Sequence, residues 1–111
     1  MSRYSSPHGV FHIDPLPGQP QIAHCHGLFV FPEYRRLGYG HVIKAQQVRL
    51  LEELGFDFAT CTVDSTNAAQ LAVLRRSSWS FMSSFHNSRT NTTTQVWGFE
   101  IKSKRTEQEV A

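Results

Sequence analysis

The sequence predicts an α/β domain in which a mixed β-sheet is flanked by two main helices. Three observations support this fold class. Apolar segments at residues 22–31 and 56–63 enclose a single amphipathic segment, an order that implies a parallel strand pair with a right-handed crossover. A second, shorter helical segment follows at residues 68–76. Two further strand segments, at 80–86 and 93–101, form a strand pair around the polar turn NSRTNT.

The chain has the size and composition of one globular domain. It contains 111 residues, of which 40% are hydrophobic and 18% are charged. This balance is typical of a folded protein rather than a disordered one. We expect a single domain over residues 1–102 and a disordered tail over 103–111, because the last residues are charged and lack a core pattern.

The charge and hydropathy of the chain limit the kinds of partner that it can be expected to bind. A net charge of +2 and a pI near 8.7 are too mildly basic to argue for nucleic acid. No apolar run approaches the roughly 20 residues that span a bilayer, and the start MSRYSSPHG lacks the apolar core of a signal peptide. Cys25 and Cys61 lie in predicted strands, which makes reduced thiols the default. We therefore expect a soluble, cytoplasmic protein that does not bind membranes.

The first half of the chain predicts strands followed by a long helix. Residues 9–13 predict a short strand, and 14–20 a turn, because three prolines and a glycine cannot extend a ladder. Residues 22–31 are mostly apolar and predict a central strand. A helix then runs from about residue 38 to 54, with Gly55 as its stop. One flank carries Ile43, Leu50, Leu51 and Leu54, while Lys44, Gln46, Arg49 and Glu53 fall mostly elsewhere.

The second half predicts a third strand followed by a shorter helix. Residues 56–63 predict the third strand. The segment DSTN, at 64–67, supplies an N-cap for the helix at 68–76.

The segment PEYRRLGYG, residues 32–40, joins the central strand to the long helix. A glycine-rich turn that opens a helix presents backbone N–H groups and a partial positive charge, which together suit a phosphate group. Arg35 and Arg36 would add charge-assisted hydrogen bonds. Two glycines at this spacing are neither the dinucleotide fingerprint nor a Walker loop, so the turn considered by itself favours a purely structural role, in which the glycines only permit a tight turn.

Two longer motifs give the turn a context. LFVFPEYRRLGYG resembles the acyl-CoA-binding motif of the GNAT superfamily of N-acyltransferases, in which an apolar strand and a proline precede R/Q-x-x-G-x-G/A. VDSTNAAQLAVLRRSSWSF resembles the family segment V-x-x-x-N-x-x-A-x-x-L-Y-x-K-x-G-F, with matches at Val63, Asn67, Arg76 and Trp79. The two motifs cover residues 22–86. The resemblance implies a central splayed mixed sheet and acetyl-CoA as acyl donor.

The resemblance also implies a path for the cofactor. Backbone amides from Leu37 to His41 would hold the pyrophosphate, and the main chain of the central strand would pair with the pantetheine arm as an added strand. Asn67 would bind near the pantetheine or hold the strand end. Arg75 or Arg76 could reach the adenosine phosphates, although a solvated helix face explains them equally well. The expected cofactor residues are Leu28, Phe29, Val30, Arg35, Arg36, Leu37, Gly38, Tyr39, Gly40, His41, Asn67 and Arg76.

The reaction needs a base, because an ammonium group has no lone pair with which to attack a thioester. His24 falls where the family's glutamate often lies and is the first candidate, acting directly or through a water. His26, on the same strand face, is the second, and Cys25 points to the other face. A hydrogen-bonded histidine in a half-buried strand is an equally good interpretation. Asp64 could act as a base, hold a cationic acceptor or cap the second helix.

The sequence departs from the family pattern at the expected proton donor. The family's tyrosine falls on Leu74, and the glycine before the aromatic residue falls on Ser78. The leaving thiolate would then be protonated by solvent or by one of three weak candidates, Ser77, Ser78 and Cys61. The histidines at 8, 12, 24 and 26 are too loosely spaced to indicate a metal site.

The acceptor and the activity itself remain open at this stage. The family places a strand and two helices before the central strand, and only residues 1–21 precede it here. We expect an open acceptor face suited to a protein lysine or N-terminus, or else a pocket completed by a second subunit in a homodimer. Two alternatives to an N-acetyltransferase are a catalytically degenerate acyl-CoA-binding or protein-binding module on the same fold, and a nucleic-acid binder that uses the arginines and the tail KSKR.

Overall fold

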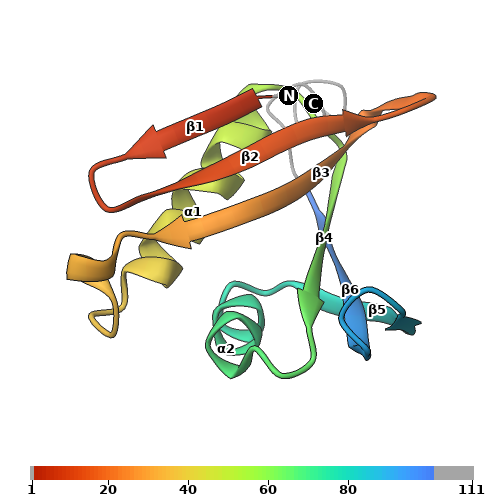
Figure 1. Cartoon of the computed structure of the whole chain (residues 1–111). Helices are drawn as coiled ribbons and strands as arrows, with labels where there is room; N and C mark the ends of the chain where they lie inside the picture. The colour runs from red at the N-terminus through yellow and green to blue at the C-terminus, as the bar shows by residue number, and fades with distance from the viewer. Residues whose placement is uncertain (1, 102–111) are drawn as a thin grey trace.

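The computed structural model describes residues 2–101 and contains one six-stranded sheet in the order β1-β2-β3-β4-β6-β5 (Figure 1). The expected mixed sheet with two main helices is confirmed. The expected tail at 103–111 lies outside the described residues. The elements are β1 (Ser2–Ser6), β2 (Gly9–Leu16), β3 (Gln19–Val30), a 3₁₀ turn (Pro32–Tyr34), α1 (Tyr39–Glu53), β4 (Phe58–Asp64), α2 (Ala68–Arg76), β5 (Ser80–Asn87) and β6 (Thr92–Glu100).

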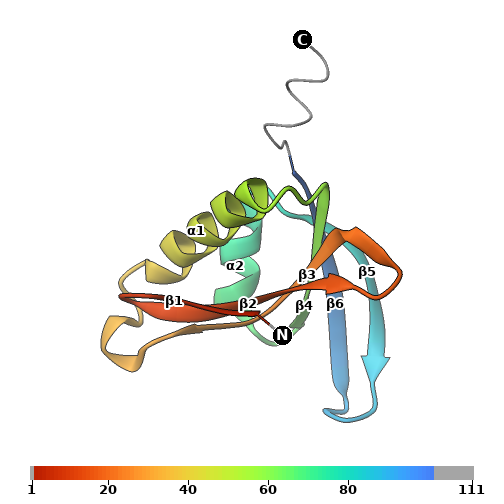
Figure 2. The same cartoon turned by 90° about the horizontal axis from the view of Figure 1, so that it is seen from above.

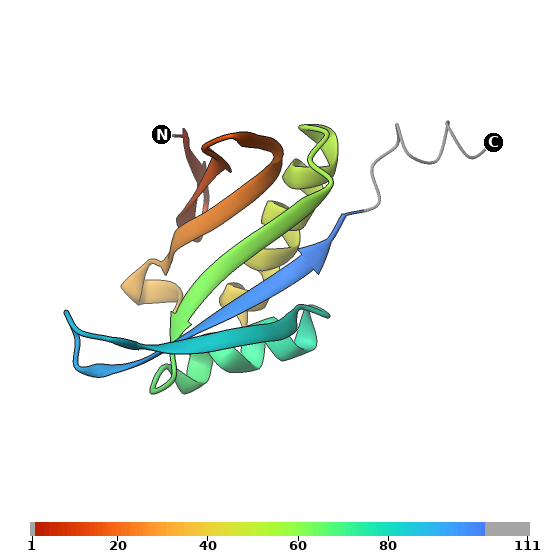
Figure 3. The same cartoon turned by 90° about the vertical axis from the view of Figure 1, so that its right-hand side faces the viewer.

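The parallel pair at the centre of the sheet is short. β3 and β4 pair only from Ile22 with Phe58 to Cys25 with Cys61, and every other strand pair is antiparallel. Beyond this point β3 stays with β2 and β4 stays with β6, so the two strands part toward their C-terminal ends (Figures 1 and 3). The sheet is therefore splayed in the middle.

A β-bulge lies where the splay begins. The register between β2 and β3 moves from His12 opposite His26 to Val10 opposite Phe29, which leaves an extra residue in β3. Gly27 has φ 65°, a conformation that favours glycine. Because a bulge bends its strand and increases its twist, it turns β3 away from β4.

Both helices lie on one face of the sheet (Figure 2). α1 crosses over from β3 to β4, and its ends agree with the expected ones to within a residue: Gly38 is the N-cap, and Gly55, at φ 82°, follows the C-cap Leu54. α2 spans the expected residues, with Asn67 as N-cap. Neither helix of residues 2–101 is long and apolar enough to cross a membrane.

The prediction of a turn over residues 14–20 is wrong. β2 continues to Leu16 and β3 starts at Gln19, so only Pro17 and Gly18 connect them. Gly18 has φ 76°, as the third position of a type II turn requires, and proline suits the second position. Pro15 is tolerated because β1 pairs with β2 no further than Ile13, which leaves the end of β2 as an edge.

Two further expectations need correction. β1 was not expected; it is a short polar strand at the sheet edge that pairs with β2 through its backbone. The division of α1 into an apolar and a polar flank is wrong at two positions. Lys44 is buried, with 1% exposure, whereas Leu54 is 49% exposed at the helix end. The helix presents Ile43, Lys44, Gln47 and Leu51 to the sheet.

We expect Ser78→Gly to stabilise the protein. α2 ends in a left-handed turn, in which Ser78 has φ 65° and the Trp79 N–H donates to the Leu74 carbonyl at 3.1 Å. A left-handed conformation is strained for serine but open to glycine, so the free energy of unfolding should rise by about 0.5–1 kcal/mol. Chemical denaturation measures this change. The control Ser80→Gly, in β5, should lower stability instead, and a loss of stability in Ser78→Gly would contradict the prediction.

Candidate functional site

A groove of about 660 Å³ runs along β3, past the turn before α1, and along α2. It brings together all the residues expected to bind a cofactor except Leu37, whose side chain is 67% exposed outside it. Sequence reasoning missed five further lining residues. They are Tyr34, Ala69, Gln70, Ala72 and Val73. Four of them belong to α2, and the small or unbranched side chains along its first two turns were the signal for a helix face that borders a groove.

The turn before α1 forms one end of the groove. Gly38 caps α1 with φ 83° and ψ 6°, and no side chain caps the first turn. The first N–H groups of α1 therefore remain available to an anion, and the helix dipole favours negative charge there. A Cβ at Gly38 would meet no heavy atom within 4 Å, so the space above the turn is open. A Cβ at Gly40 would lie 3.4 Å from Val73, which shows how closely α1 approaches α2.

Arginines flank this turn. The Arg35 Nε–H donates to the Val30 carbonyl at 3.0 Å, and the guanidinium lies 4.8 Å from the centre of the Phe29 ring. These two contacts hold Arg35 beside the end of β3. Arg36 lines the groove with φ 65°. Arg76 lines it from α2 and Arg75 does not, which distinguishes the two residues that the sequence left as alternatives.

The edge of β3 forms a wall of the groove. Phe29 and Val30 pair with β2 on one side, but the pairing with β4 has already ended at Cys25. The backbone groups of β3 beyond Cys25 that face β4 are thus open to an extended ligand, which could pair with them as an added strand.

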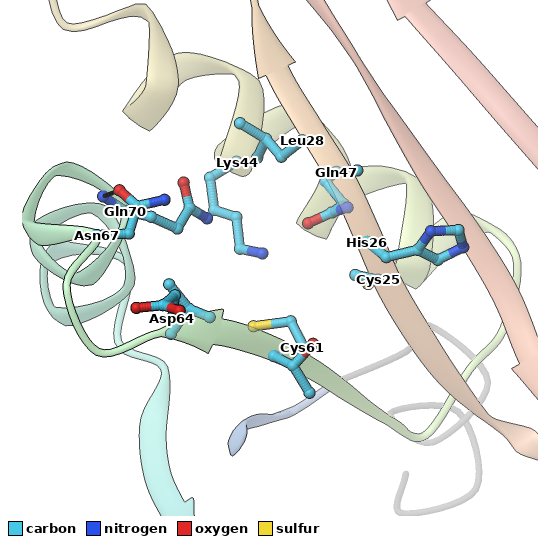
Figure 4. A pocket seen from close by; sticks show the side chains of 12 residues that line it. Cys25, His26, Leu28, Lys44, Gln47, Cys61, Asp64, Asn67 and Gln70 are labelled. Carbon is cyan, nitrogen blue, oxygen red and sulfur yellow. Dashed lines mark hydrogen bonds between the residues drawn. The ribbon is translucent and has the colours of Figure 1, made fainter. Parts of the chain in front are cut away.

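A cavity of about 210 Å³ lies in the splay between β3 and β4 (Figure 4). It shares Leu28, Asn67 and Gln70 with the groove, so the two spaces join. Lys44 and Gln47 reach it from α1, and the remaining wall comes from the two strands. The strand residues are Cys25, His26, Gly27, Cys61, Thr62, Val63 and Asp64.

Lys44 and Gln47 are the main polar groups that sequence reasoning missed here. Each is only 1% exposed, and neither side-chain polar atom of Gln47 has a hydrogen-bond partner within residues 2–101. The Lys44 ammonium lies 3.9 Å from the centre of the Trp79 ring. Burial lowers the pKa of Lys44, opposed by the nearby thiols of Cys61 and Cys25. The available signal was the spacing of 44, 47 and 51, which places all three on one helix face.

We expect Lys44→Met to stabilise the protein at pH 7 by about 1 kcal/mol or more, because a lowered pKa means that the surroundings as a whole disfavour the ammonium. Between its folded pKa and the ordinary value of 10.5, the unfolded chain binds more protons, so the wild type gains stability as pH rises. The advantage of the variant should therefore shrink toward pH 10.5. Thermal unfolding across this pH range measures the effect. Arg49→Met, on the exposed side of α1, should change little.

The histidines of β3 lie on the sheet face opposite Cys25, as alternation predicts. His24 is hydrogen-bonded to the Thr60 hydroxyl at 3.0 Å, and burial and then the neighbouring His26 lower its pKa, which keeps the imidazole neutral at neutral pH. The His26 Nε2 lies 2.6 Å from the Asp14 carboxylate. His26 lines the cavity, whereas His24 does not; their ring centres are 5.8 Å apart.

Asp64 is held by hydrogen bonds at the end of β4. It accepts from the Thr66 N–H at 2.9 Å and the Thr66 hydroxyl at 2.7 Å, and also from the Thr92 hydroxyl. The bonds from Thr92 and Thr66 lower the pKa of Asp64, so it remains an anion and is a poor proton acceptor. The cap of α2 is Asn67 instead, whose Oδ1 accepts from the Gln70 N–H at 3.1 Å.

The candidate proton donors are poorly placed. Leu74, at the position of the family's tyrosine, is fully buried in the core. Ser77 contacts His41 at 3.3 Å, and neither Ser77 nor Ser78 lines the groove or the cavity. Burial raises the pKa of Cys61, and it raises that of Cys25 to about 12. Within residues 2–101, no three His, Cys, Asp or Glu side chains gather closely enough to hold a metal ion.

Comparisons with known proteins agree on the fold. The family model described as Acetyltransferase (GNAT) family matches residues 6–78. An acetyltransferase from Bacillus subtilis in complex with CoA has a TM-score of 0.77 at 11% identity, over 89% of this chain and 74% of that one. The ribosomal-protein-S18-alanine N-acetyltransferase from Escherichia coli has a TM-score of 0.71 at 16% identity, over 86% of this chain and 62% of that one.

A third similar structure, Ard1 from Thermoplasma volcanium, has a TM-score of 0.75 at 12% identity, over 86% of this chain and 64% of that one. The chain thus spans less than two thirds of the length of the Escherichia coli and Thermoplasma proteins. No curated protein matches its sequence.

Proposed function

Because this chain belongs to the GNAT acetyltransferase family, we propose that it is an N-acetyltransferase that transfers an acetyl group from acetyl-CoA to a primary amine. The observation that carries the proposal is the continuous path from the turn at Gly38, along the open edge of β3, into the cavity in the splay. The order of chemical environments along this path matches the parts of an acyl-CoA: anion site, extended polar arm and enclosed acyl group.

The residues of the path fit the cofactor. The open N–H groups at the start of α1 would hold the pyrophosphate, with Arg36 beside them and Arg76 facing the adenosine phosphates. The main chain of Leu28 to Val30 would pair with the pantetheine arm. Asn67 and Gln70, at the junction of groove and cavity, would lie beside the thioester. The cofactor supplies an activated acyl group; the protein positions it.

The transfer requires a neutral amine. His26 borders the cavity where β3 bulges, and Asp14 orients its imidazole on the opposite face of β3 (Figure 4), so it is the base that we favour for direct proton removal from an acceptor on that face. His24, already neutral at neutral pH, would serve through a water. The histidine takes one proton from the ammonium group and keeps it. The amine nitrogen then bonds to the acyl carbon and the carbon–sulfur bond breaks. The second proton of the nitrogen passes through water to the departing thiolate, which leaves as free CoA. Asp64, a stable anion, would attract a cationic acceptor.

We propose a protein lysine or N-terminus as acceptor. His24 and His26 alternate along β3 with the buried Ala23 and Cys25 and are only partly buried, so an extended segment can approach them from the outer face of the strand. One structural neighbour acts on an alanine of a ribosomal protein by its name. We place the reaction in the cytoplasm, since Cys25 and Cys61 are free thiols.

One observation favours a second candidate function, an acyl-CoA-binding module without catalysis. Leu74 takes the place of the family's tyrosine, and the serines considered as replacement donors, Ser77 and Ser78, line neither the groove nor the cavity. The two functions make different predictions. Both require acetyl-CoA to bind, but only the enzyme releases free CoA when an amine is added.

Calorimetric titration of acetyl-CoA, followed by a thiol assay with a panel of lysine and N-terminal peptides, tests the proposal. Binding with amine-dependent CoA release supports the enzyme. Binding without release for any peptide supports the module. No binding would refute both, and the turn at Gly38 would then be structural only.

A further inference from the structure

The cavity in the splay contains a cation and an amide that find no polar partner in the described part of the protein. Lys44 has no ion pair there, and its ammonium lies against the face of Trp79 and near the thiols of Cys61 and Cys25. Both polar atoms of the Gln47 side chain are unpaired although the residue is 99% removed from solvent. An unsatisfied buried amide is destabilising, so such a group indicates a missing partner.

The titratable groups around Lys44 do not supply that partner. From β3 it faces Cys25, and from β4 Cys61 and Asp64, whereas the imidazole of His26 points away from it (Figure 4). His24, on the other face of β3, is neutral at neutral pH because burial lowers its pKa. Burial raises the pKa of both thiols, so they stay uncharged. The Asp64 carboxylate is already engaged by hydroxyl and amide donors at the end of β4. The cavity therefore contains one positive group, and its carboxylate, Asp64, is held at the end of β4 and forms no ion pair with Lys44 within residues 2–101.

A short hydrocarbon acyl group in the cavity would leave Lys44 without an ion pair and Gln47 without a hydrogen-bond partner. A methyl group offers no hydrogen-bond acceptor to either side chain, and it would bury Lys44 further from water. A carboxylate offers two oxygens, and Lys44 and Gln47, three residues apart on α1, project from one helix face as two adjacent donors.

We propose that the acyl end of this site is built for an acyl-CoA whose acyl group ends in a carboxylate, such as malonyl-CoA or succinyl-CoA, held by Lys44 Nζ and Gln47 Nε2. The proposal rests on the proposed function, because the groove must first hold the CoA moiety. It extends the donor class from acetyl to dicarboxylic acyl groups. The product would carry a negative charge where the amine was positive.

The dimensions are compatible with this ligand. The cavity measures about 210 Å³, and a water molecule occupies about 30 Å³ in the liquid, so a succinyl arm of a few heavy atoms can enter. The arm would start at the junction formed by Leu28, Asn67 and Gln70 and end beneath α1.

Binding of a carboxylate ligand should be accompanied by proton uptake at Lys44, which makes the affinity depend on pH. Because burial lowers the pKa of Lys44, part of the lysine is neutral in the empty site as pH rises, and a bound carboxylate would restore the ammonium. Affinity for succinyl-CoA should therefore fall as pH rises through the lysine's folded pKa. Affinity for butyryl-CoA should lack this dependence.

The test compares succinyl-CoA with butyryl-CoA, in which a methyl group replaces the carboxylate, by calorimetry on the full chain. Wild-type protein should bind succinyl-CoA about tenfold more tightly or better, as expected for a charge-assisted contact. Lys44→Met should lose this preference or invert it, and Gln47→Met should reduce it. Arg49→Met removes an exposed cation from the same helix and should keep it. Thermal unfolding checks that each variant is folded.

Each outcome decides the question. If the wild type binds both ligands equally, or prefers butyryl-CoA, the inference is wrong while the cofactor groove stands, and this comparison needs no variant. A preference for succinyl-CoA that survives in Lys44→Met would place the carboxylate elsewhere and would also overturn the inference. If neither ligand nor acetyl-CoA binds, the proposed function fails, and this inference fails with it.

Discussion

Gly38→Glu should reduce acetyl-CoA affinity by about a hundredfold or more, a loss of about 2.7 kcal/mol, while the protein stays folded. Gly38 caps α1 with φ 83°, and the space above it is open. A glutamate there would place a carboxylate against the N–H groups that the pyrophosphate requires. It would both compete for those donors and repel the phosphates.

Backbone strain alone must be separated from this effect. Gly55 has nearly the same conformation, φ 82°, also with no heavy atom within 4 Å of a Cβ, but it lies at the other end of α1. Gly55→Glu thus carries a similar strain away from the groove and should bind acetyl-CoA as the wild type does. Calorimetry gives the affinities, and denaturation gives the stabilities. Equal affinities for Gly38→Glu and the wild type would mean that the phosphates bind elsewhere.

His26→Gln should slow amine-dependent CoA release at pH 7 by about a hundredfold, with acetyl-CoA affinity unchanged, since a positioned general base contributes on this scale. The expectation follows from two contacts: His26 lines the cavity, and its Nε2 lies 2.6 Å from Asp14. His24→Gln should have a smaller effect, about tenfold, because His24 does not line the cavity and its imidazole is bonded to Thr60.

His12→Gln is the matched control. The His12 ring stacks on His26 at 5.0 Å but does not line the cavity, so its loss should leave the chemical step unaffected. A larger effect in His24→Gln than in His26→Gln would restore the order that the sequence register predicts. An unchanged rate in both would mean that solvent is the base.

The strand and helix pattern was largely readable from the sequence because each element is marked locally. Gly38 and Gly55 bound α1, and Asn67 caps α2, where short-range rules apply. The hairpin at Pro17 and Gly18 was misread because a proline can lie in a strand whose edge is free. Whether that edge is free depends on where β1 ends, which is a long-range fact.

The candidate site divides in the same way. Most of the lining of the groove was predictable because its residues lie in two continuous motifs, each of which folds into one loop and one helix start. The cavity was not predictable because its walls come from α1, β3 and β4 at once. Gly27 within an apolar strand was a signal for the bulge at which the cavity opens. A glycine does not by itself indicate from which neighbouring strand β3 will part.

By itself, the sequence predicted the order of the elements from residue 22 onward, the glycine turn that opens α1 and the family to which the chain belongs. Those properties depend on residues near one another along the chain. Only the tertiary structure showed that Lys44 and Gln47 are buried at the end of the groove, and that His26 rather than His24 reaches the cavity. Burial and the choice between two histidines on one strand face depend on where β3 and β4 part, and the angle between two strands is decided by the packing of the whole sheet.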